Sequence, residues 1–252
     1  MKHLLACLAV VFCLTPPARA EFTADASDDV RGYVESNLLG IFYHELGHAL
    51  IDFLDLPIFG QEEDAADVLS VFLIDAFWEE ESAVQMAYDT AFGFLGESEE
   101  RELAGEEPAY WDVHGPDLQR YYNLVCVFYG ANPEERDDVA DDLGLPPERA
   151  EYCPDEYDQA NDSWGAVLDD VLHPNNGGDF GLNTVETPTE GGRFTLEVIQ
   201  AELDALDTEL RLPFRLHTDI VPCGEPNAFY DPQTRSITIC TEFADYLVET
   251  MP

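Results

Sequence analysis

Basic side chains are scarce in this sequence, where 11 Lys and Arg residues stand against 53 Asp and Glu residues. The only lysine is Lys2, and the formal net charge is −42. A chain this acidic repels phosphate groups, so nucleic acid is excluded as a partner and anionic membrane surfaces are disfavoured. The charge is explained by solubility, with screening of the self-repulsion in a saline habitat. Attraction of cationic substrates or divalent ions is the alternative.

Long apolar runs are missing beyond the N-terminus, so no later segment is predicted to span a membrane. The one apolar run, residues 4–14, follows Lys2 and precedes Ala18-Arg19-Ala20. A positive region, an apolar core and a small-x-small site in this order are typical of a secretory signal peptide. We therefore predict that residues 1–20 are removed after Ala20. The mature chain, residues 21–252, is expected in the periplasm or outside the cell.

Cysteines are few, and four of them remain after the predicted cleavage: Cys126, Cys153, Cys223 and Cys240. In an oxidising compartment four cysteines allow three pairings. Proximity in the sequence favours Cys126–Cys153 and Cys223–Cys240, and the second bond would contribute about 3 kcal/mol by loop entropy. The C-x-x-C spacing of cysteine zinc sites is absent, so disulfides are the better prediction.

The most informative feature that is present is an H-E-x-x-H motif, His44-Glu45-Leu46-Gly47-His48. On a helix His44 and His48 lie on one face and can bind one metal ion. Zinc suits the pattern, because catalytic zinc has three protein ligands and leaves a fourth position for water. Glu45 can take a proton from that zinc-activated water and deliver it to a leaving amine. The motif predicts a zinc hydrolase, most simply a peptidase.

The residues around the motif support this interpretation. Apolar residues at three- and four-residue steps predict an amphipathic helix that begins after Ser27 and ends before Pro57. A second apolar-periodic stretch follows, in which Glu63 and Asp67 are four residues apart on one face. We assign Glu63 as the third zinc ligand, and Asp67 as the acceptor that orients a ligating histidine.

Two alternatives stay open at this point. Glu62 and Asp64 flank Glu63 on the same helix and are rival ligands. The motif histidines can also be merely packed or solvated on an ordinary helix, because such a motif arises by chance in some chains.

A third polar group lies between residues 111 and 123, where a loop enters a predicted helix. A hydrolase must stabilise the oxyanion that forms at the carbonyl, and His114 is our candidate for this role. The alternative is structural: His114 and Asp117 would cap the following helix, and Arg120 would form a buried ion pair.

The remaining sequence defines the fold class. Residues 27–172 are predicted to be mostly helical, with a loop over 97–116, and residues 173–179 form a second loop. Residues 214–222 and 236–240 are predicted strands that form a small C-terminal antiparallel hairpin, and a last helix covers 242–249. No repeat or low-complexity linker interrupts the chain, so we expect one α+β domain over residues 21–252.

With these residues identified, the chain resembles an uncharacterised family of bacterial proteins regarded as metallopeptidases, within the zincin group. The likeness rests on His44 to Asp52, Leu56-Pro57, Glu62 to Asp67, His114 with Gln119-Arg120, Cys126 with Tyr129-Gly130, Cys223-Gly224, Asn227 to Pro232, and Cys240. The Glu63–Asp67 pair is also similar to the ExxxD element of gluzincin peptidases, in which the Glu binds zinc and the Asp supports the first histidine, here His44. The interval between His48 and Glu63 is shorter than in thermolysin-like enzymes.

The resemblance implies a zincin-like fold and zinc-dependent hydrolysis of a peptide or protein substrate. A first rival hypothesis is a non-catalytic envelope protein that uses a zincin scaffold to bind peptide or protein partners. Glu45 argues against it, since a structural zinc site needs no such carboxylate. A second rival is an acidic protein that binds many cations weakly and in which the motif is incidental.

Overall fold

The computed structural model describes residues 20–173 and 177–252. Apart from Ala20, the predicted signal peptide lies outside these residues and stays a prediction. Within the described residues, no helix is both long and apolar enough to cross a membrane.

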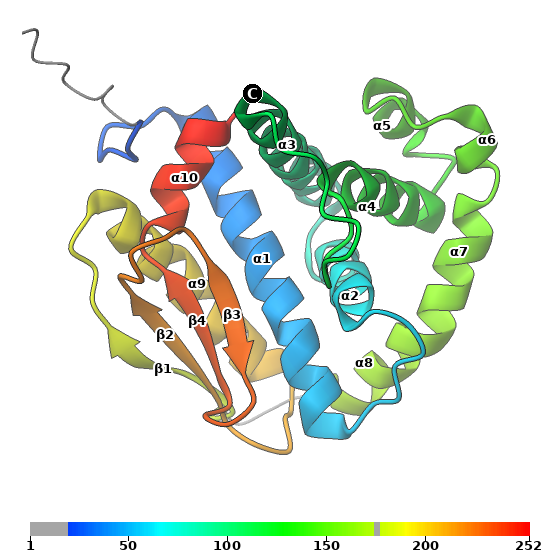
Figure 1. Cartoon of the computed structure of the whole chain (residues 1–252). Coiled ribbons are helices and arrows are strands. Elements are labelled where there is room, and N and C mark those ends of the chain that lie inside the picture. Colours follow the sequence, from blue (N-terminus) through cyan, green and yellow to red (C-terminus); the bar gives the residue numbers. More distant parts are fainter. Residues whose placement is uncertain (1–19, 174–176) are drawn as a thin grey trace, which may run out of the picture.

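The motif helix, α1 (Asp28–Leu54), runs through the centre of the molecule (Figure 1). It begins where the sequence predicts, because Ser27 Oγ accepts a hydrogen bond from the Val30 N–H at 3.3 Å. It ends at Asp55, whose φ of 52° turns the chain away from the helix ahead of Pro57.

A group of helices packs against one side of α1. α2 (Glu62–Phe77) and α3 (Glu80–Ala104) contact α1 directly, and α4 (Asp117–Ala131) packs on α2 and α3. Smaller helices continue beyond α4: α5 (Asp137–Asp142), α6 (Pro147–Ala150), α7 (Cys153–Ala160), the π-helical turn η1 (Asn161–Gly165) and α8 (Ala166–Val171). The 147–172 stretch, predicted as helical, is therefore broken into several short pieces.

A four-stranded sheet lies on the other side of α1 (Figure 1). Its strands are β1 (Phe180–Val185), β2 (Leu216–Val221), β3 (Ala228–Asp231) and β4 (Ser236–Cys240), in the order β1-β2-β4-β3. β1 and β2 are parallel, β2 and β4 are parallel, and β3 is antiparallel to β4. The edge strand β3 contacts α1, which places the end of the sheet beside the motif helix.

Two further helices complete the packing around α1 and the sheet. α9 (Glu190–Glu209) connects β1 to β2 and contacts both strands and α1, and α10 (Phe243–Thr250) packs on α1, α3 and α9. Large apolar side chains that are fully buried, among them Leu38, Leu46, Leu50 and Ile199, form the core between these elements. α1 is therefore packed on both sides, and burial of these side chains fixes its position.

The α+β class and the dominance of helices are confirmed, and two details are corrected. The predicted strands around residues 216–221 and 236–240 run parallel, so the hairpin partner of β4 is the short strand β3 in the connection between them. Residues 97–104, predicted as loop, are the last turns of α3, which ends at Gly105 with φ of 73°. Glu has good helix propensity, and it extends this helix.

Both predicted disulfides are present. Cys126–Cys153 joins α4 to the start of α7 with Cα atoms 5.1 Å apart, and Cys223–Cys240 joins the segment after β2 to the end of β4 with Cα atoms 5.4 Å apart. Two disulfides are compatible with an oxidising compartment.

Candidate metal centre

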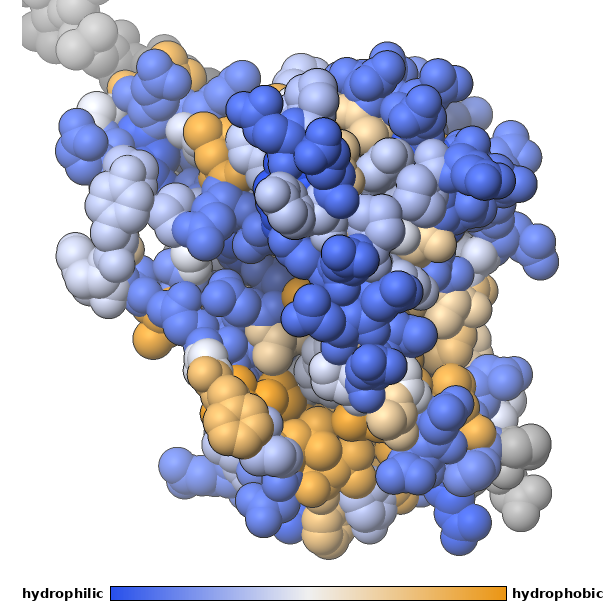
Figure 2. Space-filling model, turned by 90° about the vertical axis from the view of Figure 1, so that its right-hand side faces the viewer, coloured by the Kyte–Doolittle hydropathy of each residue, from blue (hydrophilic) through white to orange (hydrophobic). Residues whose placement is uncertain are grey.

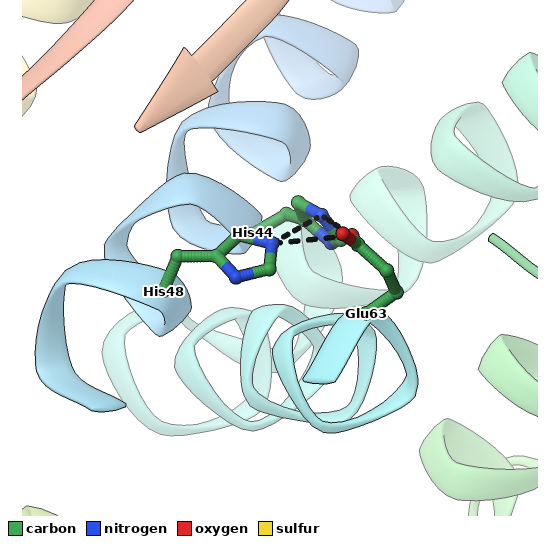
Figure 3. A group of neighbouring side chains, drawn as sticks. All are labelled: His44, His48 and Glu63. Carbon is green, nitrogen blue, oxygen red and sulfur yellow. Dashed lines mark hydrogen bonds and ion pairs between the residues drawn. The ribbon is translucent and has the colours of Figure 1, made fainter. Parts of the chain in front are cut away.

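Three side chains from α1 and α2 point toward one another (Figure 3). His44 Nε2 lies 3.2 Å from His48 Nε2, and each of the two nitrogens lies 3.1 Å from Glu63 Oε2. These residues form a group that could hold a metal ion. The structure thus brings together the three residues that the sequence assigns as zinc ligands.

The outer nitrogens of both rings are already committed as donors. His44 Nδ1 lies 2.7 Å from Asp67 Oδ1, and His48 Nδ1 lies 2.8 Å from Glu62 Oε1. An ionised carboxylate only accepts, so each Nδ1 carries the hydrogen, and each Nε2 of a neutral ring presents a lone pair. Two lone pairs and one carboxylate oxygen therefore face a common point and repel each other unless a cation lies among them.

The spacing of these atoms fits a small divalent metal. Zinc bonds of about 2.0–2.2 Å in tetrahedral geometry place neighbouring ligand atoms about 3.3 Å apart. The observed separations of 3.1–3.2 Å are close to this value. Two imidazoles and one carboxylate are also a ligand set that zinc enzymes use.

The pKa values of His44 and Glu63 reflect the close approach of these three side chains. Burial alone would lower the pKa of His44, but Asp67 and Glu63 raise it to about 9. Burial alone would raise the pKa of Glu63, yet His114, His44 and His48, which can donate to it when their rings are protonated, hold it well below its usual range. A proton on a ring relieves part of the repulsion, and a divalent cation would relieve it for all three atoms at once.

The close packing of α1 and α2 sets these distances. Gly47 lies between the two histidines, and a Cβ atom there would stand 3.0 Å from Ala66 Cα of α2. Glu63 lies in the first turn of α2, where the exposed N–H groups of the helix favour a negative charge. The short connection over residues 55–61 therefore suffices to place Glu63 over the motif.

Asp67 connects the site to α4. Arg120 donates to Asp67 Oδ2 from Nε at 2.8 Å and to Oδ1 from Nη2 at 2.7 Å. Burial alone would raise the pKa of Asp67, but Arg120 and His44 hold it well below its usual range. Asp67 therefore stays ionised and keeps the His44 ring in one orientation.

Glu45 is buried beside the histidines, with 5% of its surface exposed. Burial raises its pKa, while His44, His48 and the backbone N–H of Tyr230 in β3 oppose that shift and Glu63 adds to it. A carboxyl group whose pKa is raised can exchange a proton near neutral pH more readily than an ordinary one. The effect of Tyr230 on this pKa indicates that Glu45 lies near the edge strand.

His114 reaches the same centre from the connection between α3 and α4. Its Nε2 lies 3.0 Å from Glu63 Oε2, and its ring stacks near that of His44 with centroids 6.3 Å apart. Asp112 Oδ1 accepts from the Val113 N–H at 2.6 Å, which shapes the turn that presents His114. The capping role considered for Asp117 is not observed, since its carboxylate accepts from Arg101 Nε at 2.9 Å.

Sequence reasoning placed the ligand trio, Asp67 and His114 in one region but missed other contributors. Glu62, considered only as a rival ligand, is instead the partner of His48 Nδ1. The structural alternative for Arg120 is an ion pair whose partner the sequence does not indicate, and that partner is Asp67. The position of Arg120, three residues after the start of α4, does not indicate which carboxylate it pairs with.

A cavity of about 1000 Å³ adjoins the site. His44, Glu45 and His114 line it, and it extends between α1, α3, α4 and α10. The face of the molecule in Figure 2 is mainly hydrophilic, with one hydrophobic area in its lower part, as expected from the excess of acidic residues.

Comparison with known proteins identifies a family. A family model described as "Putative metallopeptidase" (DUF4344) matches residues 7–168, which is more than half of the chain and includes the whole candidate metal centre. Neither a search of curated proteins nor a search of solved structures finds a match.

Proposed function

Because the chain belongs to the family whose model is described as "Putative metallopeptidase", we propose that it is a zinc metallopeptidase. Its substrates are peptides or proteins in the periplasm or outside the cell. The observation that carries the proposal is the convergence of His44 Nε2, His48 Nε2 and Glu63 Oε2, with both outer ring nitrogens already donating to carboxylates. Such an arrangement needs a cation, and the ligand set favours zinc.

Glu45 and His114 supply the protein's part of the chemistry. When bound, zinc would polarise the substrate carbonyl group and lower the pKa of the attacking water to about 7. Glu45 takes the proton from that water and passes it to the amine nitrogen as the C–N bond breaks, while the hydroxyl oxygen stays on the carbonyl carbon. His114 donates a hydrogen bond to the carbonyl oxygen as negative charge develops there.

The edge strand β3 supports a peptide as the substrate. β3 pairs with β4 on one side only and lies against α1, and the Tyr230 N–H already interacts with Glu45. An extended peptide can add to such an edge through backbone hydrogen bonds. Its scissile bond would then lie next to Glu45.

Metal content is the first test. Elemental analysis of protein purified from an oxidising compartment should find about one zinc per chain, lost in His48→Ala. His217→Ala is the matched control, because His217 lies in β2 away from the centre. If the wild-type chain holds no stoichiometric zinc after zinc is supplied at neutral pH, the proposal fails and weak binding of many cations becomes the better explanation.

Turnover is the second test. A peptide library is incubated with wild type and Glu45→Gln, and new amino termini are detected by mass spectrometry. Glu45→Gln should keep the zinc and lose hydrolysis, whereas Glu35→Gln, which changes an exposed glutamate of the same helix, should cleave like wild type. Stoichiometric zinc without turnover on any peptide would favour the non-catalytic scaffold instead.

A further inference from the structure

The cavity beside Glu45 extends far beyond the metal centre. Its lining includes Asn37 and Glu45 of α1, which are eight residues apart and therefore about 12 Å apart along the helix. The lining also includes Glu97 of α3 and Tyr246 of α10, and Glu97 lies close enough to Tyr33, eleven residues before His44 in α1, to raise its pKa. Hydrolysis itself needs no such extension, so the chemistry of the lining indicates which part of a substrate the cavity can bind.

Carboxylates outnumber guanidinium groups in this lining, and both guanidinium groups are already paired. Arg120 is held by Asp67, and Arg101 donates to Asp117 Oδ2 at 2.9 Å. The lining therefore presents an excess of negative charge to whatever enters.

Glu97 is a partly buried carboxylate of the lining. Within residues 20–173 and 177–252 it makes no hydrogen bond or ion pair. Burial raises its pKa to about 7, against the opposing effect of Arg120 and Arg101. Glu100, one turn away, already accepts from the Tyr246 hydroxyl at 2.9 Å. A carboxylate that has lost much of its water without gaining a partner is stabilised by an incoming cation.

The apolar part of the lining suits a long aliphatic chain. Ile41, Phe94 and Leu247 line the cavity and provide apolar surface. Lys and Arg side chains place their methylene groups on such surface and their charge at the tip. An extended side chain of this kind carries its charge away from the peptide backbone and can therefore enter a cavity beside the scissile bond.

We propose that this cavity binds a lysine or arginine side chain of the substrate, with Glu97 as the residue that determines the specificity. The inference rests on the proposed function, since it names the substrate class of the same site. A substrate with an apolar or acidic residue at this position would leave Glu97 without a partner or would repel it, so it should be a poor substrate.

The test uses matched fluorogenic peptides in which arginine, norleucine or glutamate is placed in turn at each position around a cleaved bond. At one position wild type should cleave the arginine peptide with a kcat/KM about 10- to 100-fold above the norleucine peptide, the range of a hydrogen bond to a charged group. Glu97→Gln should lose this preference mainly through KM. Equal cleavage of the three peptides at every position would overturn the inference and leave the proposed function standing.

Surface charge alone would also attract basic peptides, so the control must carry the same net charge. Glu99→Gln provides it, because Glu99 is exposed on α3 only two residues away and does not line the cavity. Glu99→Gln should keep the preference for arginine, also at about 0.5 M salt, where surface attraction is largely screened. If Glu99→Gln loses as much preference as Glu97→Gln, the preference belongs to the surface and the inference is wrong.

A binding measurement separates the two proposals. The anisotropy of labelled arginine and norleucine peptides is measured with Glu45→Gln, which leaves the cavity intact, and with Glu45→Gln/Glu97→Gln. Binding that favours arginine and depends on Glu97 supports the inference even if wild type hydrolyses no peptide and the proposed function fails. Circular dichroism confirms that each variant is folded, and equal binding of both peptides to folded protein counts against the inference.

Discussion

Asp67 accepts hydrogen bonds from two sides: from Arg120 at 2.7 and 2.8 Å, and from His44 Nδ1 at 2.7 Å. The guanidinium group of Arg120 in turn lies over the ring of Phe94, 4.5 Å from its centroid. The Asp67 carboxylate thus links Arg120 of α4, which packs on Phe94 of α3, to His44, the first histidine of the motif.

Replacing Arg120 should therefore weaken metal binding without removing a ligand. We expect Arg120→Met to raise the Kd for zinc about 10- to 100-fold, the usual cost of losing a residue that orients a ligand. Competition with a chelator measures this Kd. Arg149→Met is the control, since it breaks the Arg149–Glu156 ion pair far from the centre, and it should leave the Kd unchanged. An unchanged Kd in Arg120→Met would contradict the role given to Asp67.

The contact of Gly47 with Ala66 gives a second prediction. In Gly47→Ala the new methyl group meets the backbone of α2, so the helices must separate by a few tenths of an ångström. We expect a loss of about 1–3 kcal/mol in the free energy of unfolding and weaker zinc binding. Gly32→Ala lies in the same helix with no atom near the added group, and should gain about 1 kcal/mol. Urea unfolding of both variants checks the difference in sign.

The third prediction concerns acid. Arg136 donates to Glu80 at 2.7 and 2.9 Å and holds the pKa of Glu80 below its usual range. Because the folded-state pKa lies below the unfolded value of about 4.3, this ion pair stabilises the fold above that pH, and the contribution is lost as the pH falls through the folded-state pKa.

Glu80→Gln should consequently be less stable than wild type at neutral pH, and the difference should shrink as the pH falls below about 4. Unfolding midpoints in urea between neutral and acidic pH measure this trend. Glu81→Gln, an exposed neighbour in the same first turn of α3, should follow wild type throughout. A difference that stays constant with pH would refute the electrostatic explanation.

Removal of the Cys126–Cys153 disulfide should also be costly. The bond closes a separation of 27 residues, and both cysteines are fully buried. Cys126→Ala/Cys153→Ala should lose about 2–4 kcal/mol in the free energy of unfolding. Denaturant unfolding of wild type and of the double variant, both with Cys223–Cys240 oxidised, provides the comparison, and equal stability of the two proteins would show that the bond contributes little.

The candidate site could be predicted because its information is local. His44, Glu45 and His48 occupy one helix turn, and Glu63 and Asp67 another, so helical periodicity alone groups them. The cap at Ser27 and the apolar spacing fixed the boundaries of α1 in the same way. What the pattern could not provide is which acid of the 62–64 run would meet which ring nitrogen, because that depends on the crossing of α1 and α2.

The sequence-based predictions are wrong where contacts between residues distant in the sequence determine the structure. β1 contains Gly181 and Asn183, which have low strand propensity, and its pairing with β2 comes from α9 packing on both strands. The parallel pairing of β2 with β4 likewise depends on the position of β3, which reverses the chain direction in the connection between these two strands. The sequence predicts a loop from Glu97 because the stretch that follows is rich in Glu and Gly, although the helix continues through Glu97 to Ala104.

α1 touches β3 on one side and α2 on the other, so the register of this one helix matters for everything around it. A single residue inserted between Ser27 and His44 would rotate the remainder of α1 by about 100° relative to its N-terminal part. The two imidazoles would then turn away from Glu63, while the apolar stripe would leave the sheet. Relatives with an altered chain length should therefore carry their insertions in the short helices beyond α4 or in the segment after α3, and α1 should keep its length up to the motif.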